Sequence, residues 1–364
     1  MATRRVEVTN LGIVEYEDGL ELQDHLRRAV AAGELADQLL LLEHPPVVTM
    51  GRSGNPDHLV ADPEALAARE IGYFPTGRGG DVTFHGPGQL VGYPIVDLNP
   101  DRRDVHRYVR DLEEVLIRTL ADFDVSAGRI PGLTGVWVGD LKVAAIGVRI
   151  SRWITSHGFA FNVDTDLDYF DTIVPCGIRD RGVTSLSRLL GEPVALADVR
   201  ERVAIRFGDV FDREVVAQSD VLESVQVLVW RDTVAEPNVL LLKRTASRGG
   251  FWQPVTGRVE AGEAPRQTAI REAAEETGLA GDLTDLDLIR DFRIENEYLG
   301  GTGPRPTILR EHAFAMRASS DAVTLSPNEH EEHLWTTPER AKELLRWNGN
   351  RRALAKLLRM GNRS

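Results

Sequence analysis

The stretch GRVEAGEAPRQTAIREAAEETGL, residues 257–279, decides how the second half of this chain of 364 residues is interpreted. Its glycines, acids and arginine stand at fixed intervals, at Gly257, Glu263, Arg271, Glu272, Glu275, Glu276, Gly278 and Leu279. The segment PRQTAIREAAEET predicts a helix, and the glycine that follows it is a common helix stop. The last three glutamates are then three or four positions apart, so their carboxylates share one face of the helix.

Three carboxylates on one helix face repel each other, and that repulsion lowers the stability of the helix. A hard divalent cation such as Mg²⁺ relieves the repulsion and can bridge the oxygens of a diphosphate. The alternative is a solvated acidic helix, which such a cluster taken alone allows equally well. The flanking glycines, together with Glu263 and Arg271, favour metal binding.

With all these positions present, residues 257–279 resemble the Nudix box, with one soft departure at Ala273, where a larger aliphatic residue is usual. The resemblance covers roughly residues 222–364 and implies an α/β/α sandwich. It also implies hydrolysis of a nucleoside or similar diphosphate linked to another moiety, with Mg²⁺ as cofactor and a metal-activated water attacking phosphorus.

The Nudix resemblance also implies a role for each acidic and basic position. The main metal ligands would be Glu272 and Glu276, and Glu275 would contribute. Arg271 would orient a glutamate by ion pairing, and Glu263 would be a supporting ligand or a helix-start group.

A finer resemblance flanks the box. LLKRTASRGGFWQPVTGRVEAGE (241–263) and NEHEEHLWTTPERAKELLRWNGNRRAL (328–354) are similar to the dihydroneopterin-triphosphate pyrophosphatase branch. That similarity implies Glu329 as a further metal ligand or base. Trp252 is expected either to stack on a base or pterin ring or to be a core aromatic. The substrate would be a nucleoside- or pterin-type di- or triphosphate.

The first half of the chain holds the lone cysteine, in DTIVPCGI (171–178). A free cysteine is most often a small buried hydrophobe. However, Pro175 fixes the chain before Cys176 and Gly177 lets it turn sharply after it, which suits a side chain presented at a loop tip. A thiol becomes a nucleophile when a cation lowers its pKa and a base accepts its proton, and Lys142 is a residue that can do both.

Four blocks of the first half resemble the octanoyltransferase of lipoate synthesis, an octanoyl-[acyl-carrier-protein]:protein N-octanoyltransferase, in the order of that family. They are TGRGGDVTFHGPGQLVGYPIVDL (76–98), GVWVGDLKVAAIGVRIS (135–151), HGFAFNVDTDLDYFDTIVPCGI (157–178) and VTSL (183–186). The match spans about residues 5–215. It implies the biotin and lipoate protein ligase fold, a mixed sheet with flanking helices.

Carried over position by position, this resemblance implies Cys176 as the acyl-thioester nucleophile and Lys142 as its pKa-lowering and proton-transferring partner. It implies a substrate channel lined by Arg78, Gly79, Gly80, Asp81, Val82, Thr83, Phe84, His85, Ala145, Ile146, Gly147, Gly158, Phe159 and Ala160. His85 is expected to shape the pocket, or to be a strand-capping hydrogen-bonder, and not to act as a base. No cofactor is expected for this domain.

The implied partners are octanoyl acyl carrier protein, lipoyl domains of 2-oxoacid dehydrogenases and the glycine cleavage H protein. Since the carrier protein is acidic and this chain has a formal net charge of −13, encounter requires a locally basic face. Arg149, Arg152, Arg179 and Arg181 flank the expected site and are predicted to form that face.

The whole chain is therefore expected to be α+β with two domains, residues 1–215 and 222–364, joined by a linker at 216–221. Predicted elements include a helix within 21–45, a helix at about 103–123, a hairpin turning at Gly139-Asp140 and strands at 225–232 and 238–245. DREVVAQSD, residues 212–220, is the best linker candidate.

The bulk composition excludes several classes of protein. One cysteine rules out an internal disulfide or a cysteine-cluster zinc site, and the acidic balance disfavours nucleic-acid binding. The first ten residues predict no signal peptide, and no apolar run predicts a membrane span, so a cytoplasmic location is expected. Two alternatives remain: an ATP-dependent lipoate ligase in the first domain, and a non-catalytic nucleotide sensor in the second.

Overall fold

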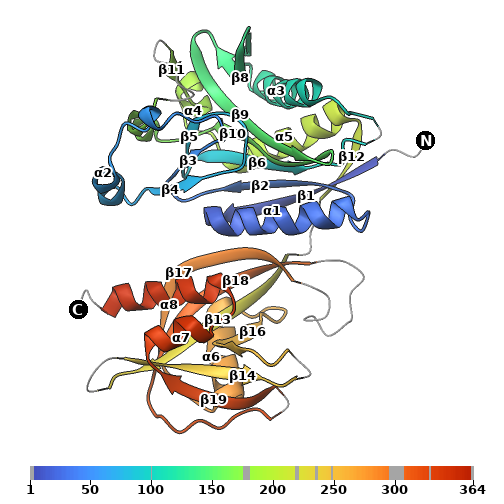
Figure 1. Ribbon diagram of the computed structural model, residues 1–364. Coiled ribbons are helices and arrows are strands. Elements are labelled where there is room, and N and C mark those ends of the chain that lie inside the picture. Colours follow the sequence, from blue (N-terminus) through green and yellow to red (C-terminus); the bar gives the residue numbers. More distant parts are fainter. Residues whose placement is uncertain are drawn as a thin grey trace. The chain divides into compact units, whose positions relative to one another are not determined.

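The computed structural model describes residues 4–99, 101–174, 181–217, 221–233, 237–246, 249–294, 307–327 and 329–361. Its contacts divide the chain into two compact units, Met1–Ser219 and Asp220–Ser364 (Figure 1). Among the described residues, no helix is both long enough and apolar enough to cross a membrane.

The first unit is built on a nine-stranded mixed sheet in the order β12-β1-β2-β6-β10-β9-β8-β7, with β11 paired to β9. The strands are β1 (Arg4–Ile13), β2 (Asp37–Glu43), β6 (Gln89–Ile95), β7 (Gly128–Ile130), β8 (Leu133–Val138), β9 (Leu141–Ser151), β10 (Ile154–Asn162), β11 (Gly182–Val183) and β12 (Arg213–Ala217). A separate small sheet has the order β4-β3-β5, from β3 (Val47–Met50), β4 (Gly72–Pro75) and β5 (Val82–His85).

Helices cover both faces of the large sheet. Helices α3 (Val105–Ala121) and α5 (Leu196–Phe211) pack against each other and share one core cluster with strands β1, β2, β9 and β10. Helix α1 (Tyr16–Ala31) contacts β6 and β10 (Figure 1). Shorter helices complete the unit: η1 (Pro56–His58), α2 (Pro63–Ala68), η2 (Leu167–Thr172) and α4 (Leu186–Leu190).

The helix predicted within 21–45 is wrong in its second half. Helix α1 ends at Ala31, Gly33 turns the chain with φ at +72°, and Asp37–Glu43 forms strand β2. Its four consecutive leucines are fully buried between β1 and β6. A short apolar run fits a buried strand as well as a buried helix, so periodicity could not separate the two. The predicted helix near 103–123 and the hairpin turn at Gly139-Asp140 are confirmed.

The second unit is a seven-stranded mixed sheet between helices. The order is β15-β14-β13-β18-β17, with β16 on β13 and β19 on β14. The strands are β13 (Val221–Arg231), β14 (Asn238–Arg244), β15 (Trp252–Gln253), β16 (Val255–Arg258), β17 (Gly281–Ile294), β18 (Thr307–Ala318) and β19 (His330–Thr336).

The alternation along β13 assigns its side chains to two cores. Val225, Val227 and Val229 pack with helix α6 (Pro265–Thr277) on one face. Leu228 packs on the other face with helices α7 (Pro338–Leu344) and α8 (Asn348–Gly361). Successive side chains of a strand point to opposite faces, so a helix on each side gives the predicted α/β/α sandwich.

Residues 212–220 are predicted from the sequence as a linker, but part of this stretch belongs to the first sheet. Residues 213–217 form β12, which pairs parallel with β1, and Val221 already begins β13. Of the predicted linker at 216–221, its first two residues therefore belong to β12. The polar composition of residues 212–220 suggests an exposed linker. However, Arg213 in this stretch is buried and forms ion pairs instead of facing solvent.

Those ion pairs centre on Arg213 and Asp37, whose side chains are each 2% exposed. Arg213 Nε donates to Asp37 Oδ2 at 2.8 Å, and Nη1 donates to Asp101 Oδ2 at 3.0 Å. Asp37 Oδ1 also accepts hydrogen bonds from Arg4 Nη2 at 3.0 Å and from the Asp97 amide at 2.9 Å. This network ties β12 to β1 and β2.

Replacing Asp37 by alanine is expected to lower the free energy of unfolding of the first unit by about 3–5 kcal/mol, because a buried guanidinium loses its main counter-ion. The control is Glu214→Ala on β12, next to Arg213, because the pair of Glu214 with Arg5 is more than half exposed on both sides and is worth about 1 kcal/mol or less. Pulse proteolysis in urea, with first-unit peptides quantified by mass spectrometry, measures both. Equal losses would contradict the assignment of β12 to the buried network.

Candidate functional sites

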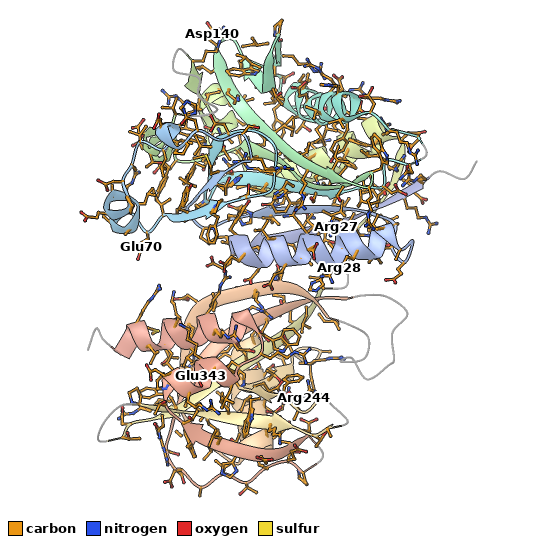
Figure 2. The ribbon with its side chains drawn as sticks, in the orientation of Figure 1. Arg27, Arg28, Glu70, Asp140, Arg244 and Glu343 are labelled. Carbon is orange, nitrogen blue, oxygen red and sulfur yellow. The ribbon has the colours of Figure 1, made fainter. Side chains whose placement is uncertain are left out.

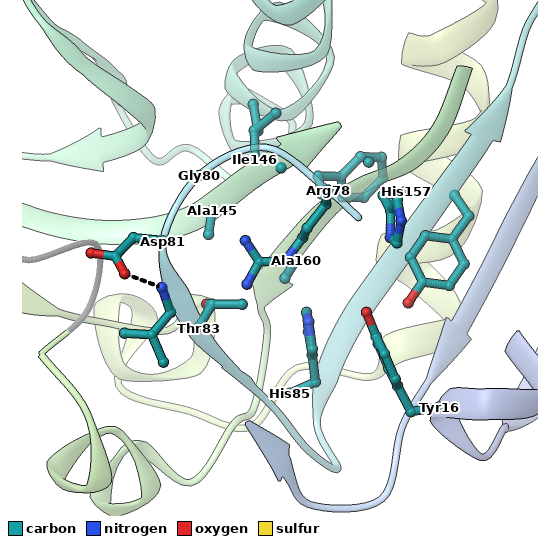
Figure 3. A pocket seen from close by; sticks show the side chains of 15 residues that line it. Tyr16, Arg78, Gly80, Asp81, Thr83, His85, Ala145, Ile146, His157 and Ala160 are labelled. Carbon is teal, nitrogen blue, oxygen red and sulfur yellow. Dashed lines mark hydrogen bonds between the residues drawn. The ribbon is translucent and has the colours of Figure 1, made fainter. Parts of the chain in front are cut away.

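A pocket in the first unit gathers side chains from elements far apart in the sequence (Figure 3). Its lining residues are Tyr16, Arg78, Gly80, Asp81, Val82, Thr83, His85, Tyr93, Ala145, Ile146, Gly147, His157, Gly158, Phe159 and Ala160. They come from the start of α1, the loop before β5, β5 itself and strands β6, β9 and β10. Twelve of the fourteen residues expected to line the channel therefore lie together.

The two expected lining residues that the pocket lacks have other positions. Gly79 fixes the loop, because its amide donates to Val148 O on β9 at 2.9 Å. Phe84 is fully buried and stacks on Tyr169 with ring centroids 4.8 Å apart. On a strand, neighbouring side chains face opposite ways, so Phe84 points away from the side that Thr83 and His85 share.

Arg78 is a buried cation that the loop places inside the pocket. Its Nη2 donates to Thr49 O and Thr49 Oγ1, both at 2.8 Å, and its Nη1 donates to Gly79 O at 3.1 Å. The side chain lies against Gly147, where an added Cβ would sit 3.1 Å from Arg78 Cδ. The glycine-rich sequence is thus required on β9 as well as in the loop, because backbone and guanidinium share the space.

His85 has a defined tautomer. Gln89 donates its amide hydrogens to Phe84 O at 3.1 Å and Asn162 Oδ1 at 2.9 Å, so its oxygen accepts from His85 Nδ1 at 2.8 Å. Burial holds the pKa of His85 well below its usual range, with further lowering from His44 and Arg78. The ring is therefore neutral and its Nε2 is a hydrogen-bond acceptor.

A second buried pair lies beside the pocket. His44 Nδ1 lies 2.5 Å from Val14 O, to which it must donate, so His44 Nε2 accepts the Tyr93 hydroxyl hydrogen at 2.7 Å. Burial lowers the pKa of His44 to about 4 and that of His157 to about 4, in the latter case with Arg78 and Arg149 adding repulsion. Burial also raises the pKa of Tyr16 to about 12.

Three lining residues, Tyr16, Tyr93 and His157, are not among those predicted from the sequence. Figure 3 shows Tyr16, His85, His157 and Arg78 directed into one space. Tyr16 opens α1, some 60 residues before the loop, and no local pattern marks it. His157 has a φ of +56°, which is uncommon for a residue with a side chain. That angle marks the residue as unusual, but it is visible only in the structure.

Lys142 lies on β9, three residues before the pocket residue Ala145, and is 5% exposed. Its Nζ lies 4.9 Å from the ring centroid of Trp137, and Val183 of β11 is its neighbour across the pair of strands. Cys176 lies outside the described residues. On either side of its segment, the Val174 amide donates to His58 O at 2.7 Å and Val183 pairs with Lys142.

The arginines expected to form one basic face are separated. Arg181 pairs with Asp140 just before β9, whereas Arg152 follows the other end of that strand. Eleven strand residues span on the order of 35 Å. Figure 2 shows Asp140 at the opposite edge of the first unit from Arg27 and Arg28, the neighbours of Arg152 around a surface hollow. Arg149 lies against Gly77, and Arg179 lies outside the described residues.

In the second unit, Arg271 organises the Nudix-like helix α6. It makes two hydrogen bonds with Glu263, at 3.0 and 2.9 Å, and one each with Glu272 at 2.8 Å and Glu275 at 3.1 Å. The two bonds from Arg271 to Glu263 lower the pKa of Glu263 to about 2. The predicted ion pairing of Arg271 therefore involves three glutamates, and Glu263 acts at the helix start, outside the cluster described next.

The carboxylates of α6 have different environments. Glu275 is 59% exposed, whereas the Glu276 side chain is 4% exposed. Glu272 lies over Gly257, where a Cβ would sit 1.9 Å from Glu272 Cδ. Burial raises the pKa of Glu272 to about 7, despite Arg271, and burial also raises the pKa of Glu276.

Glu329 comes to Glu276 from the end of the loop before β19. Ligand atoms of Glu276, Glu329 and His330 all lie within 4.8 Å of one another. The buried oxygen Glu276 Oε2 lacks a hydrogen-bond partner, and a buried carboxylate oxygen without a partner is costly. Together with the carboxylate of Glu329, it fits a divalent cation. His330 was not predicted. Trp252, half-buried, packs against the core cluster of α7 and α8.

Comparison with known proteins defines the class of each unit. The family profile for the lipoyl protein ligase A/B catalytic domain matches residues 15–208, and that for the NUDIX domain matches residues 222–357. A crystal structure of lipoate-protein ligase A bound with ATP shares the fold of the first unit, at 17% identity and a TM-score of 0.51, over 59% of this chain and 90% of that one. The chain thus joins a lipoyl protein ligase A/B catalytic domain to a NUDIX domain.

The closer relatives define the family within that class. An octanoyltransferase of Myxococcus xanthus is 46% identical over 352 residues, which are 95% of this chain and 97% of the relative. One from Solibacter usitatus is 54% identical over 206 residues, 57% of this chain and 93% of the relative. The chain belongs to the octanoyltransferase family, and the alignment with the Myxococcus relative extends through both units.

The buried histidines predict that the first unit loses stability as pH falls from about 6.5 to about 4. Both His44 and His157 are neutral when folded, with a pKa of about 4, and near 6.5 when unfolded. The unfolded state therefore binds more protons in that pH window. Each histidine lowers the free energy of unfolding by about 3 kcal/mol as the pH falls across it. His44→Gln can keep both hydrogen bonds. It should lower the number of protons taken up on unfolding in this pH window by about one, which reduces the slope of stability against pH.

Pulse proteolysis in urea at pH 4.5, 5.5, 6.5 and 7.5 measures the effect on the first unit. His106→Gln is the control, because His106 is exposed on α3, and its pH dependence should equal that of the parent. An unchanged slope in His44→Gln would refute the assignment of a neutral buried imidazole.

Proposed function

We propose that the first unit transfers an octanoyl group from acyl carrier protein to a lysine of lipoyl domains, including the glycine cleavage H protein. The observation that carries this proposal is the match of nearly the whole chain to the Myxococcus octanoyltransferase. The position of Lys142 on the strand that also lines the pocket supports it. The lone cysteine is consistent with the reducing cytoplasm as its compartment.

In this proposal the Cys176 thiolate attacks the carbonyl carbon of the octanoyl thioester, and the carrier thiol leaves with a proton from Lys142. An acyl-cysteine thioester forms while the carrier thioester breaks. The substrate lysine then gives a proton to Lys142 and attacks the new thioester, forming an amide and releasing the thiolate. Backbone N–H groups would stabilise the oxyanion at each step.

Two observations support a role for Lys142 in this exchange. Its side chain is buried, at 5% exposure, on the strand that also lines the pocket. The Thr184 amide donates to Lys142 O at 2.9 Å, so the chain that leaves the Cys176 segment is fastened to the lysine's own backbone. Ala145 and Ala160 line the pocket with small apolar side chains, which suits an acyl chain, and the depth of the pocket would set the preferred chain length.

Mixing the full chain with octanoyl carrier protein is expected to add one octanoyl group, seen as a mass increase on the intact protein without ATP. Cys176→Ser should abolish a stable adduct. Lys142→Ala should lower the transfer rate by about 100-fold or more, since general acid–base catalysis contributes that much.

An ATP-dependent ligase is the competing reaction for this fold. It would show no adduct from the carrier protein and would instead modify lipoyl domains only with free octanoate and ATP. Arg118→Gln is a control of the same residue type, because its side chain pairs with Glu114 on helix α3, outside the pocket lining, and its adduct yield should equal that of the parent.

For the second unit we propose hydrolysis of a nucleoside- or pterin-type di- or triphosphate, which makes the chain bifunctional. The supporting observation is that buried Glu276 on the Nudix-like helix and half-buried Glu329 have carboxylate oxygens within 4.8 Å of each other. The alternative, a non-catalytic nucleotide sensor, does not need two carboxylates held so close together.

Glu272, Glu276 and Glu329 would hold a divalent cation, Mg²⁺ in the first instance, with Arg271 fixing the direction of Glu272. When bound, the cation would supply positive charge to the phosphate oxygens and activate a water for attack on phosphorus. The protein's own part is to hold the carboxylates in position, as Arg271 does for Glu272. Glu275, exposed and bonded to Arg271, would support that arrangement from outside.

Glu276→Gln is expected to lower Mg²⁺-dependent hydrolysis by about 100-fold or more, since loss of one metal ligand removes several kcal/mol of charge stabilisation. Glu275→Gln, its exposed neighbour, should lose less than about tenfold. A screen of phosphorylated substrates, including dihydroneopterin triphosphate, with phosphate release as the readout measures both. If Glu276→Gln matched the parent on every substrate that is turned over, the metal assignment would fail.

A further inference from the structure

A buried histidine lies against the carboxylate pair of the second unit. His330 is the first residue of β19, directly after Glu329, and is 3% exposed. Its Nε2 lies 3.2 Å from Glu276 Oε2. Among the described residues, neither ring nitrogen of His330 has a hydrogen-bond partner of good geometry, nor has Glu276 Oε2.

This arrangement is costly for the protein alone. Leaving a buried polar group without a partner costs about 1–3 kcal/mol, and here an imidazole and a carboxylate oxygen share that condition at one place. A cation between them would satisfy both groups together. The buried, unpartnered nitrogen is an observation independent of the acidic cluster, and it points to the same ligand.

The geometry suits one ion. An octahedral ion with bonds of about 2.1 Å brings its ligand atoms about 3.0 Å apart when adjacent and about 4.2 Å apart when opposite. The ligand atoms of Glu276, Glu329 and His330 lie within 4.8 Å of one another. Glu329 is also fixed through its backbone, because the Thr245 amide donates to Glu329 O at 3.1 Å.

We propose that His330 Nε2 is a metal ligand, which adds an imidazole to the carboxylates proposed for this site and makes the site prefer Mn²⁺ or a later first-row divalent ion to Mg²⁺. This deepens the metal assignment of the proposed hydrolase and rests on it. Mg²⁺ takes oxygen ligands and keeps several waters. Imidazole suits transition metals, whose affinity rises from Mn²⁺ towards Cu²⁺.

The direct test is pulsed electron paramagnetic resonance of Mn²⁺ bound to the full chain at one equivalent. The expected result is electron spin echo modulation from a directly bound ¹⁴N, which changes to the ¹⁵N pattern when the protein is labelled with ¹⁵N-histidine. The labelling changes no side chain, so the result does not depend on the folding of a variant. Bound Mn²⁺ without nitrogen modulation would overturn the proposal while leaving the carboxylate site intact.

Calorimetric titration with Mn²⁺ and with Mg²⁺ gives the second readout. His330→Gln should weaken Mn²⁺ binding by about 10–100-fold and Mg²⁺ binding by less than about threefold. His333→Gln, an exposed histidine on the same strand, should leave both affinities unchanged. Equal losses for both ions in His330→Gln would indicate that the imidazole only positions Glu276, against the proposal.

Glu276→Gln separates this inference from the proposed function. That variant should lose both ions. If it bound both as tightly as the parent, the metal site of the hydrolase itself would be refuted, whereas the nitrogen readout concerns His330 alone.

Discussion

In each unit of this protein a charged side chain lies directly on the backbone of a glycine, and the candidate sites depend on that contact. In the first unit Arg78 lies over Gly147, and in the second Glu272 lies over Gly257. A charge taken out of water needs close hydrogen-bonding partners. Removing Cβ from the neighbouring strand lets Arg78 reach Thr49 and Gly79. It likewise lets Glu272 sit between the sheet and Arg271.

The pocket of the first unit follows from this constraint. The loop that carries Arg78 is fastened to β9 through Gly79, and β9 also carries Lys142. Around the guanidinium, the histidines stay neutral because burial and the neighbouring cation both disfavour a second positive charge. The result is a site with a fixed cation and several hydrogen-bonding groups of defined direction. Such a site can hold a polar group at the guanidinium, and the alanines in its lining suit an apolar chain.

Much of the fold and of the site could be read from local pattern. The Nudix-like helix, its glycine stop and the Gly139-Asp140 hairpin have short-range signals that the structure reproduces. Pattern failed at β2, where a buried run has no period, and at β12, where Arg213 looks like part of a linker but forms a buried pair with Asp37 and a second pair with Asp101. In both cases the residues that pack against the segment, or pair with it, are distant in sequence, so no window of neighbouring residues contains them.

Ordered motifs along the chain are enough to identify the two families, the residue types of both sites and the position of the lone cysteine. Which acids meet depends instead on how the chain packs. That packing separates Glu275, exposed beside Arg271, from Glu276, and it brings Glu329 and His330 to the latter. It also adds Tyr16, Tyr93 and His157 to the pocket and places Arg152 far from Arg181. The physical reason is that burial and proximity are set by how strands and helices pack, whereas a motif records only spacing along the chain.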